Sequence, residues 1–316
     1  MKSVFQPEGQ PGTSAENQQP QPQTQQGGQQ PPASPTPPAN VAPVWWTTSL
    51  KELGSSLPCG ILGSGGRSRT FRLRPFRMKE ERELSKLRDG ANSLTFGTFV
   101  SEVLSMMIQT VGPHTFDTIS AAQRKLVLSQ MEMADVLYMY LYLRYEAMGS
   151  EEPVVLPIMC PNCHHQFRVD ADLGTLEVKV VPDSTADLRR LCKLRDGLVI
   201  QGAMRDTVWL APLKWSVSDS PMFNAGSASI ALIVQSSIVG ANGVNLNPFI
   251  ISDPELDEMT KRDIEIISAD INNNTPGPVM AVKSDCPKCK NQLVKMLDWG
   301  YDSFFSKSSP VIHGSH

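Results

Sequence analysis

The spacing of apolar side chains changes several times along the chain, and each spacing predicts a different kind of element. Polar and apolar residues alternate over residues 70–76, which predicts a strand ended by Pro75, and the charged stretch 78–88 predicts a helix. Apolar residues recur at helical spacing over residues 95–111 and predict a second helix. The sequence Ser129-Gln130-Met131-Glu132 has the pattern of a capping box, so a third helix is expected to begin at Ser129.

The second half of the chain mixes strand and helix patterns. Residues 176–181 alternate as in a strand, and the stretches 198–208 and 230–239 are apolar and rich in β-branched residues, which predicts further strands. The sequence Asp253-Pro254-Glu255 supplies a cap, a first-turn proline and a first-turn acid. A helix is therefore expected to begin there and to run to about residue 271.

These elements predict an α+β fold in three parts. Residues 1–44 form a tail, residues 45–150 form a unit of a strand and helices, and residues 151–316 form a zinc-ribbon unit interrupted by a mixed α/β insertion at about 171–278. The tail is rich in Gln, Pro, Gly, Ser and Thr, so it cannot bury enough apolar surface to offset its conformational entropy. It is expected to be disordered and to serve as a solubilising linker or as a tether.

Two groups of aromatic residues are candidates for contact with a partner protein. Trp45 and Trp46 follow the tail, and two adjacent exposed tryptophans would let it dock on another protein. Trp299, Phe304 and Phe305 form an aromatic cluster near the last residues of the sequence. They are expected either to close the core or to contact a neighbouring protein.

Composition narrows the class of protein. The 316 residues are 40% hydrophobic and 19% charged, as in soluble globular proteins. The formal net charge of −3 gives no general attraction to phosphate, so a nucleic-acid partner is not expected. Neither a signal peptide nor a membrane-spanning run is recognised, and the protein is expected to be cytosolic when it is made.

Two identical Cys-Pro-x-Cys sequences contain four of the six cysteines: Cys160 with Cys163, and Cys286 with Cys289. This spacing lets two thiolates reach one tetrahedral ion at ~2.3 Å. Each pair also stands between two strand-like runs, as in a zinc ribbon. One structural zinc ion held by all four cysteines is therefore predicted.

Alternatives to this single site stay open. The long segment between the two cysteine pairs also allows two separate sites. Two redox-active dithiols are disfavoured because proline follows the first cysteine of each pair and no thioredoxin-like βαβ pattern surrounds them. A third alternative is a site that uses His164 or His165 in place of one cysteine. It is disfavoured because four thiolates already complete a tetrahedral shell. A complete shell leaves no position for substrate, and no catalytic motif is recognised, so enzymatic activity is not expected.

The surroundings of the two cysteine pairs resemble each other. In both places a helix, a proline, the Cys-Pro-x-Cys sequence and a glutamine, Gln166 or Gln292, follow in the same order. Duplication of one unit made of a helix and a cysteine turn explains this order. Chance convergence on the same hairpin explains it equally well.

The order of several short motifs over residues 71–181 resembles one known protein family. The motifs are Phe71-Arg72-Leu73-Arg74-Pro75-Phe76 before a Glu/Arg-rich helix, Leu128-Ser129 before a helix through Asp135 to Leu143-Arg144-Tyr145, then Gly149, Cys-Pro-x-Cys and Asp172-Leu173. Together they resemble the baseplate family of T-even-like contractile phage tails, which includes hub and wedge assembly proteins. The resemblance implies a non-enzymatic component or assembly factor of such a baseplate.

The resemblance also implies partners and a location. The partners would be other baseplate and tail proteins, or a second copy of the chain, first in the cytoplasm of the bacterial host and then in the tail baseplate of the virion or of a tail-like particle. Two other functions stay open: a transient assembly chaperone that is absent from the mature particle, and a zinc-ribbon nucleic-acid-binding protein. Acidic residues in the ribbon segments largely cancel the basic ones, which disfavours the last function.

Overall fold

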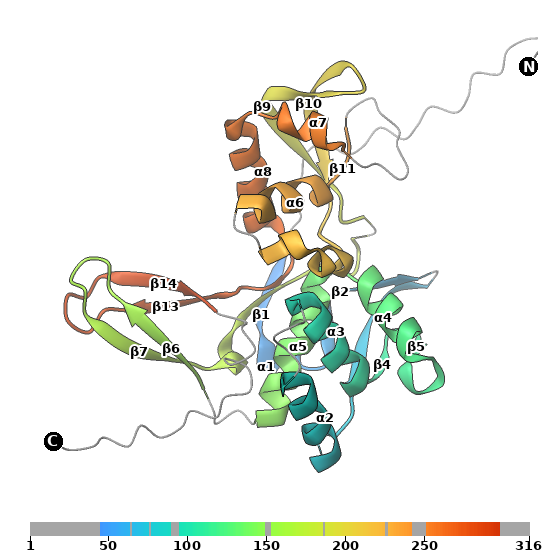
Figure 1. Ribbon diagram of the computed structural model, residues 1–316, viewed down its shortest axis with the longest axis vertical. Helices are drawn as coiled ribbons and strands as arrows, with labels where there is room; N and C mark the ends of the chain where they lie inside the picture. The colour runs from blue at the N-terminus through green and yellow to red at the C-terminus, as the bar shows by residue number, and fades with distance from the viewer. Residues whose placement is uncertain are drawn as a thin grey trace, which may run out of the picture. The chain divides into compact units, whose positions relative to one another are not determined.

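The structure, a computed structural model, describes most of the chain after residue 44. The described residues are 45–63, 65–75, 77–89, 95–148, 153–185, 187–224, 227–241 and 251–297. They form a mixed α+β fold of short antiparallel sheets and packed helices (Figure 1). The disorder expected for residues 1–44 concerns a segment outside the described residues.

The first sheet is antiparallel and has the strand order β2-β3-β4-β5. Its strands are β2 (Ser56–Gly63), β3 (Gly66–Leu73), β4 (Ile108–Val111) and β5 (His114–Thr115). The strand predicted over residues 70–76 is the end of β3. The observed strand begins earlier and stops two residues before Pro75, which has no amide hydrogen to donate to a neighbouring strand.

Two helices, α2 (Met78–Asp89) and α3 (Phe96–Met107), connect β3 to β4, and the first confirms a prediction. The helix predicted over residues 95–111 is too long, because the chain becomes extended at Ile108, with φ −77° and ψ 131°. Ile108 pairs with Leu73 of β3. Pairing with a strand distant in sequence therefore overrides the helical spacing, and β-branched residues favour that outcome.

Helices α4 (Ala121–Gln130) and α5 (Met133–Met148) follow and meet at a break. The prediction that one helix begins at Ser129 is wrong. Ser129 lies in the last turn of α4, where its hydroxyl donates to a backbone carbonyl of the same helix at 2.8 Å. The capping box that opens α4 is formed by Ser120 and Gln123.

Residues far along the chain determine the break between α4 and α5. The amide of Trp215 donates to the carbonyl of Met131 at 2.9 Å, and the amide of Met133 donates to the carbonyl of Leu213 at 2.8 Å. These bonds take the place of helical ones. Trp215 is completely buried, and its indole N–H donates to Ser101 Oγ at 2.8 Å.

The main core contains the tyrosines of α5. Tyr138 and Tyr140 are completely buried. The hydroxyl of Tyr138 donates to the carbonyl of Gly54 at 2.6 Å, and its ring packs edge-on against Phe71, with centroids 6.2 Å apart. Helix α5 is therefore held inside the molecule by both apolar and polar contacts.

A small three-stranded sheet with the order β1-β8-β12 packs against this core. Its strands are β1 (Trp46–Ser49), β8 (Glu177–Val180) and β12 (Gly277–Pro278), and the short helix α1 (Leu50–Leu53) follows β1. The strand predicted over residues 176–181 is confirmed by β8. Four 3₁₀ helices complete the described connections: η2 (Phe116–Thr118), η3 (Leu173–Thr175), η4 (Trp215–Asp219) and η5 (Pro221–Asn224).

A second antiparallel sheet, of order β11-β10-β9, begins the second half of the chain. Its strands are β9 (Arg190–Ile200), β10 (Ala203–Leu210) and β11 (Ile238–Ala241). The run predicted as strand over residues 198–208 is interrupted by a hairpin turn. Gln201 and Gly202 adopt positive φ angles of 53° and 74°, which reverse the chain between β9 and β10.

Three helices accompany this sheet: α6 (Ser227–Ser237), α7 (Asp253–Asp257) and α8 (Lys261–Asn274). The strand predicted over residues 230–239 is wrong for most of its length, because the segment is helical and becomes extended only at Ile238. The helix predicted to begin at Asp253 is two helices. Ser252 caps α7, and Thr260 caps α8.

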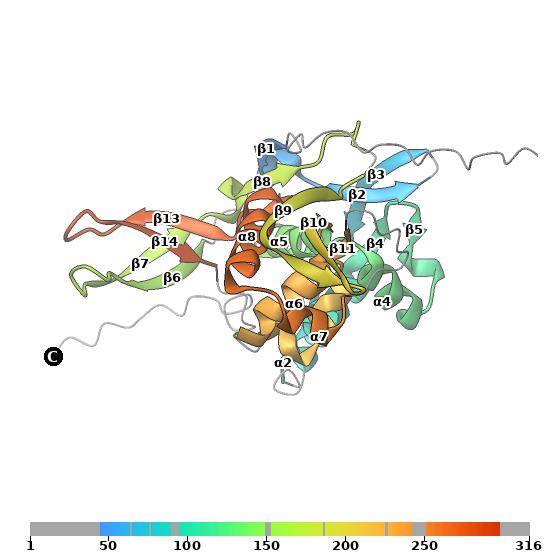
Figure 2. The same ribbon diagram turned by 90° about the horizontal axis from the view of Figure 1, so that it is seen from above.

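Two β-hairpins carry the cysteine pairs. The first consists of β6 (Val154–Met159) and β7 (Gln166–Ala171), and the second of β13 (Ala281–Asp285) and β14 (Gln292–Met296). Each hairpin is a two-stranded sheet of its own, and the two lie side by side in Figure 1 and in the turned view of Figure 2. The strand-like runs predicted around both cysteine pairs are confirmed.

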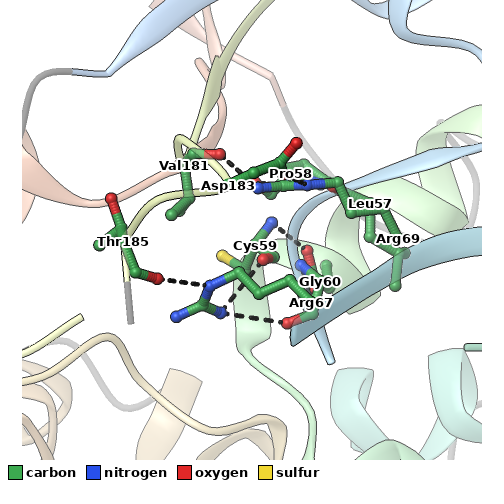
Figure 3. A network of polar contacts seen from close by, with 10 residues as sticks. Leu57, Pro58, Cys59, Gly60, Arg67, Arg69, Val181, Asp183 and Thr185 are labelled. Atoms are coloured by element: carbon green, nitrogen blue, oxygen red, sulfur yellow. Dashed lines mark hydrogen bonds and ion pairs between the residues drawn. The ribbon is translucent and has the colours of Figure 1, made fainter. Parts of the chain in front are cut away.

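Asp135, near the start of α5, holds a bulge of residues 57–60 in β2. Its carboxylate is almost completely buried and accepts hydrogen bonds from two backbone amides of the bulge, at 2.7 and 3.0 Å. Arg67 and Arg69 of β3 hold the bulge by donating to its four carbonyls (Figure 3). The same two arginines also bind residues 181–185, the connection to the second half of the chain.

Burial raises the pKa of Asp135 to about 7 from an ordinary value of 3.8, although the bulge amides act in the opposite direction. The folded protein therefore binds this proton more tightly than the unfolded chain, so the contribution of Asp135 to stability is fully present below pH 3.8 and is lost as the pH rises through about 7. We expect the free energy of unfolding of the wild type to fall between about pH 5 and pH 8 relative to Asp135→Asn, whose amide does not titrate. Urea unfolding at both pH values measures this difference, and a pH-independent difference would contradict it.

Candidate metal centre

All four cysteines predicted as metal ligands come together in the turns of the two hairpins: Cys160, Cys163, Cys286 and Cys289. Their sulfur atoms all lie within 4.8 Å of one another. The Cys160 and Cys289 sulfurs are 3.6 Å apart, and so are those of Cys163 and Cys286. Bonds of ~2.3 Å to a tetrahedral ion place sulfurs ~3.8 Å apart, so the cluster has the size of a four-cysteine metal site.

The two turns have the same backbone geometry. In each turn the amide of the first cysteine donates to the carbonyl five residues later, that of His165 at 3.0 Å or of Asn291 at 2.9 Å. The residue after the second cysteine, His164 or Lys290, has a positive φ of 54° or 58°. Two turns of one conformation thus face each other across the sulfur cluster.

Backbone amides also bind the sulfur of the second cysteine in each turn. The amide of Asn291 lowers the pKa of Cys289 to about 6. The amide of His165 lowers the pKa of Cys163 too, but desolvation and the neighbouring thiols outweigh it and raise that pKa to about 12. Both amides lie two residues after the second cysteine, as expected from the Cys-Pro-x-Cys spacing, which turns backbone N–H groups toward the sulfurs.

Four thiolates at these distances repel one another, so the fully deprotonated cluster requires a cation. The two 3.6 Å sulfur contacts join one hairpin to the other, which favours one shared site over two separate dithiols. The cluster contains no histidine: the ring of His165 instead stacks on Phe167, with centroids 6.1 Å apart. A small apolar group that includes Ile158 and Leu293 packs around the sulfurs.

The other predicted site residues are not part of this cluster. Trp46 is 48% exposed, but Trp45 is partly buried and packs against Cys59, Ala134 and Val181, so the expectation of two exposed tryptophans is wrong for Trp45. Adjacent side chains of an extended chain point in opposite directions, and one of two neighbours therefore faces inward. The aromatic residues proposed as further partner contacts lie outside the described residues: Trp299, Phe304 and Phe305.

Comparisons of this chain with protein families, with curated proteins and with solved structures found no match. Among the helices of the described residues, none has the length and apolar character required to cross a membrane.

We expect the protein to bind one metal ion per chain, and we expect Cys160→Ser or Cys286→Ser to weaken that binding, so that the purified variants contain less than one ion per chain. Cys192→Ala is the matched control, because it removes a buried thiol that lies outside the cluster. Structural metal binding is worth on the order of 10 kcal/mol in small modules, so both serine variants should also melt well below the control. Elemental analysis and thermal unfolding measure the two effects, and a full metal ion retained by Cys160→Ser would rule out the cluster as the site.

The two tryptophans should differ in their effect on stability. Trp45→Ala removes packing against a buried cluster and is expected to lower the free energy of unfolding by about 2 kcal/mol, less than for a fully buried tryptophan. Trp46→Ala changes an exposed side chain and should cost no more than about 0.5 kcal/mol. Denaturant unfolding of both variants tests this order, and equal losses would contradict the assigned burial.

Proposed function

We propose that this protein is a non-enzymatic structural or assembly component of the baseplate of a contractile phage tail or tail-like injection system. The observation that carries the proposal is the position of the residues that resemble that family. Phe71, Asp135 and Leu143 are buried, and Asp135 holds a strand bulge in place. These motif residues therefore stabilise the fold, which is what we expect of a structural protein that assembles with others.

We further propose that the metal of the cysteine cluster is zinc. A tetrahedral set of four thiolates suits zinc or iron, and two Cys-Pro-x-Cys hairpins with no other ligand suit structural zinc. Four cysteine ligands complete the shell, so the ion has no open position for a substrate or for an activated water. The proposed role of zinc is to hold two hairpins that have little apolar core of their own.

The outer faces of the hairpins favour a protein partner over a nucleic acid. On the first hairpin Arg168 and Asp170 lie on the same face, and on the second Lys283 and Asp285 do, so the charges cancel on these two faces. The positive charges outside these faces are on the second hairpin: Lys288 and Lys290 in its turn, and Lys295 on the opposite face of β14. Nucleic-acid binding needs a surplus of positive charge. Exposed apolar side chains on these faces suit a protein contact instead: Met159 (60%), Val294 (62%) and Met296 (61%).

We expect quantitative mass spectrometry to find the chain in purified contractile tails at a constant copy number per tail. Loss of the gene should stop baseplate assembly. A Cys286→Ser/Cys289→Ser protein should fail to restore it, because the hairpins lose their metal, whereas Cys192→Ala should restore it. Normal tails formed in the absence of the chain would contradict the proposal.

Two other outcomes would identify the alternative functions. A chain that is required for assembly but is missing from finished tails is an assembly chaperone. A chain that binds single-stranded or double-stranded nucleic acid at physiological salt, with binding lost in the cysteine variant, is a zinc-ribbon nucleic-acid-binding protein.

A further inference from the structure

We infer that the chain contains two copies of one structural unit, over residues 56–171 and 190–296, and that the metal centre is the place where the two copies pair. Each cysteine turn is then half of a site, and the partner of each half is a second copy of the same unit. The segment between the cysteine pairs is then mostly the second copy rather than an insertion. This inference is independent of the proposed baseplate role.

The order of elements is the same in both units. Both units contain, in this order, a hairpin (β2-β3 or β9-β10), a helix (α3 or α6), a strand (β4 or β11), two helices (α4 and α5, or α7 and α8) and a hairpin (β6-β7 or β13-β14). The first unit has α2, β5 and η2 in addition, and the second has η4, η5 and β12. The sheets share the order β2-β3-β4 and β9-β10-β11, and the first sheet has β5 as a fourth strand. Capping boxes open α4 and α7, and α3 and α6 lead into β4 and β11 without a loop.

The strand register is the same as well. In both sheets the third strand pairs with the second in the same antiparallel register, interrupted by a bulge at the same place. The equivalent pairs are Leu73–Ile108 with Leu210–Ile238, Arg72–Thr110 with Trp209–Gly240, and Phe71–Val111 with Val208–Ala241. The residue that follows each second strand donates its amide hydrogen to the carbonyl of the last residue of α3 or α6. These bonds run from Arg74 to Met107 at 2.7 Å and from Ala211 to Ser237 at 2.9 Å.

A buried aspartate holds a strand bulge in each unit. Asp263 is the third residue of α8, as Asp135 is of α5, and it is completely buried. It accepts hydrogen bonds from the amides of Arg195, Asp196 and Gly197 in β9, at 2.7, 3.2 and 3.1 Å. The second and third of these residues are the equivalents of the two whose amides bind Asp135.

A glycine ends each bulge for the same steric reason. Gly60 and Gly197 have φ angles of 74° and 85°, which residues with a Cβ rarely adopt. A Cβ would lie 3.2 Å from the carbonyl oxygen of Ser68 at the first position and 3.0 Å from that of Arg205 at the second. Ser68 follows Gly60 at the same spacing as Arg205 follows Gly197. Pro75 and Pro212 also follow their glycines at equal spacing.

The metal cluster has the geometry that two-fold pairing requires. Exchange of the two turns maps the contact between Cys160 and Cys289 onto that between Cys286 and Cys163, and both are 3.6 Å. The first cysteine of each turn is buried and the second is partly exposed. Convergence on a common turn would explain this cluster alone, but it would not explain the matching register and bulge contacts elsewhere.

The inference predicts which cysteine substitutions have matching effects. Tetrahedral Co²⁺–thiolate absorption in the full chain reports metal affinity, and each cysteine-to-serine variant should lose at least the ~100-fold that loss of an outer ligand contact costs. The loss for Cys160→Ser should match that for Cys286→Ser, and the loss for Cys163→Ser should match that for Cys289→Ser. Losses that group by turn, with both cysteines of one turn affected more than both of the other, would overturn the pairing.

A second measurement does not depend on metal. A substitution scan of residues 53–75 and 190–212 in the full chain, read by abundance of folded protein, gives a tolerance profile for each hairpin. The two profiles should agree best at the offset that places Gly60 on Gly197. The absence of a maximum at this offset would overturn the duplication, whatever metal the protein binds. A maximum in a protein that does not bind Co²⁺ would refute only the metal centre.

Discussion

The convergence of four sulfur atoms constrains the rest of the described structure. Cys163 and Cys286 are 123 positions apart in the chain, yet their sulfurs are 3.6 Å apart. Each supporting hairpin has only two strands and few buried side chains, and such hairpins are marginal on their own. The metal ion proposed for this cluster would replace thiolate repulsion by four attractive bonds, and it would then stabilise both hairpins and the path of the chain between them.

A second constraint acts within each half of the chain. A bulged strand leaves backbone amides without partners in the sheet, and a buried unpaired amide costs about 1–3 kcal/mol. Asp135 and Asp263 supply acceptors from the first turn of a helix. One interaction thus joins helix to sheet in both halves, and the helix that carries it leads on to a cysteine hairpin.

The sequence contained enough information for the mixed fold, the strands around the cysteines and the cluster itself, because Cys-Pro-x-Cys has a fixed local geometry. It did not contain enough for elements decided by distant partners. Helical spacing up to Val111 gave way to pairing with β3, and the apparent strand over residues 230–239 is mostly helix α6. The helix start expected at Ser129 moved because Leu213 and Trp215 bind the backbone between α4 and α5. Trp45 faces inward because it packs against Cys59, Ala134 and Val181, and the sequence does not show that these residues come together.

The residues shared by the two halves are those that geometry demands, and the differences mark where the halves have specialised. Glycine at positive φ, a buried aspartate, a proline after the second strand and two cysteines recur, whereas Arg67 and Arg69 correspond to Met204 and Asp206. The arginines bind residues 181–185 in addition to the bulge, so they attach the first half to the start of the second. In the proposed arrangement, a paired scaffold with one metal at its junction would diverge in this way on its outer faces without loss of the fold, and those faces would then meet neighbouring proteins.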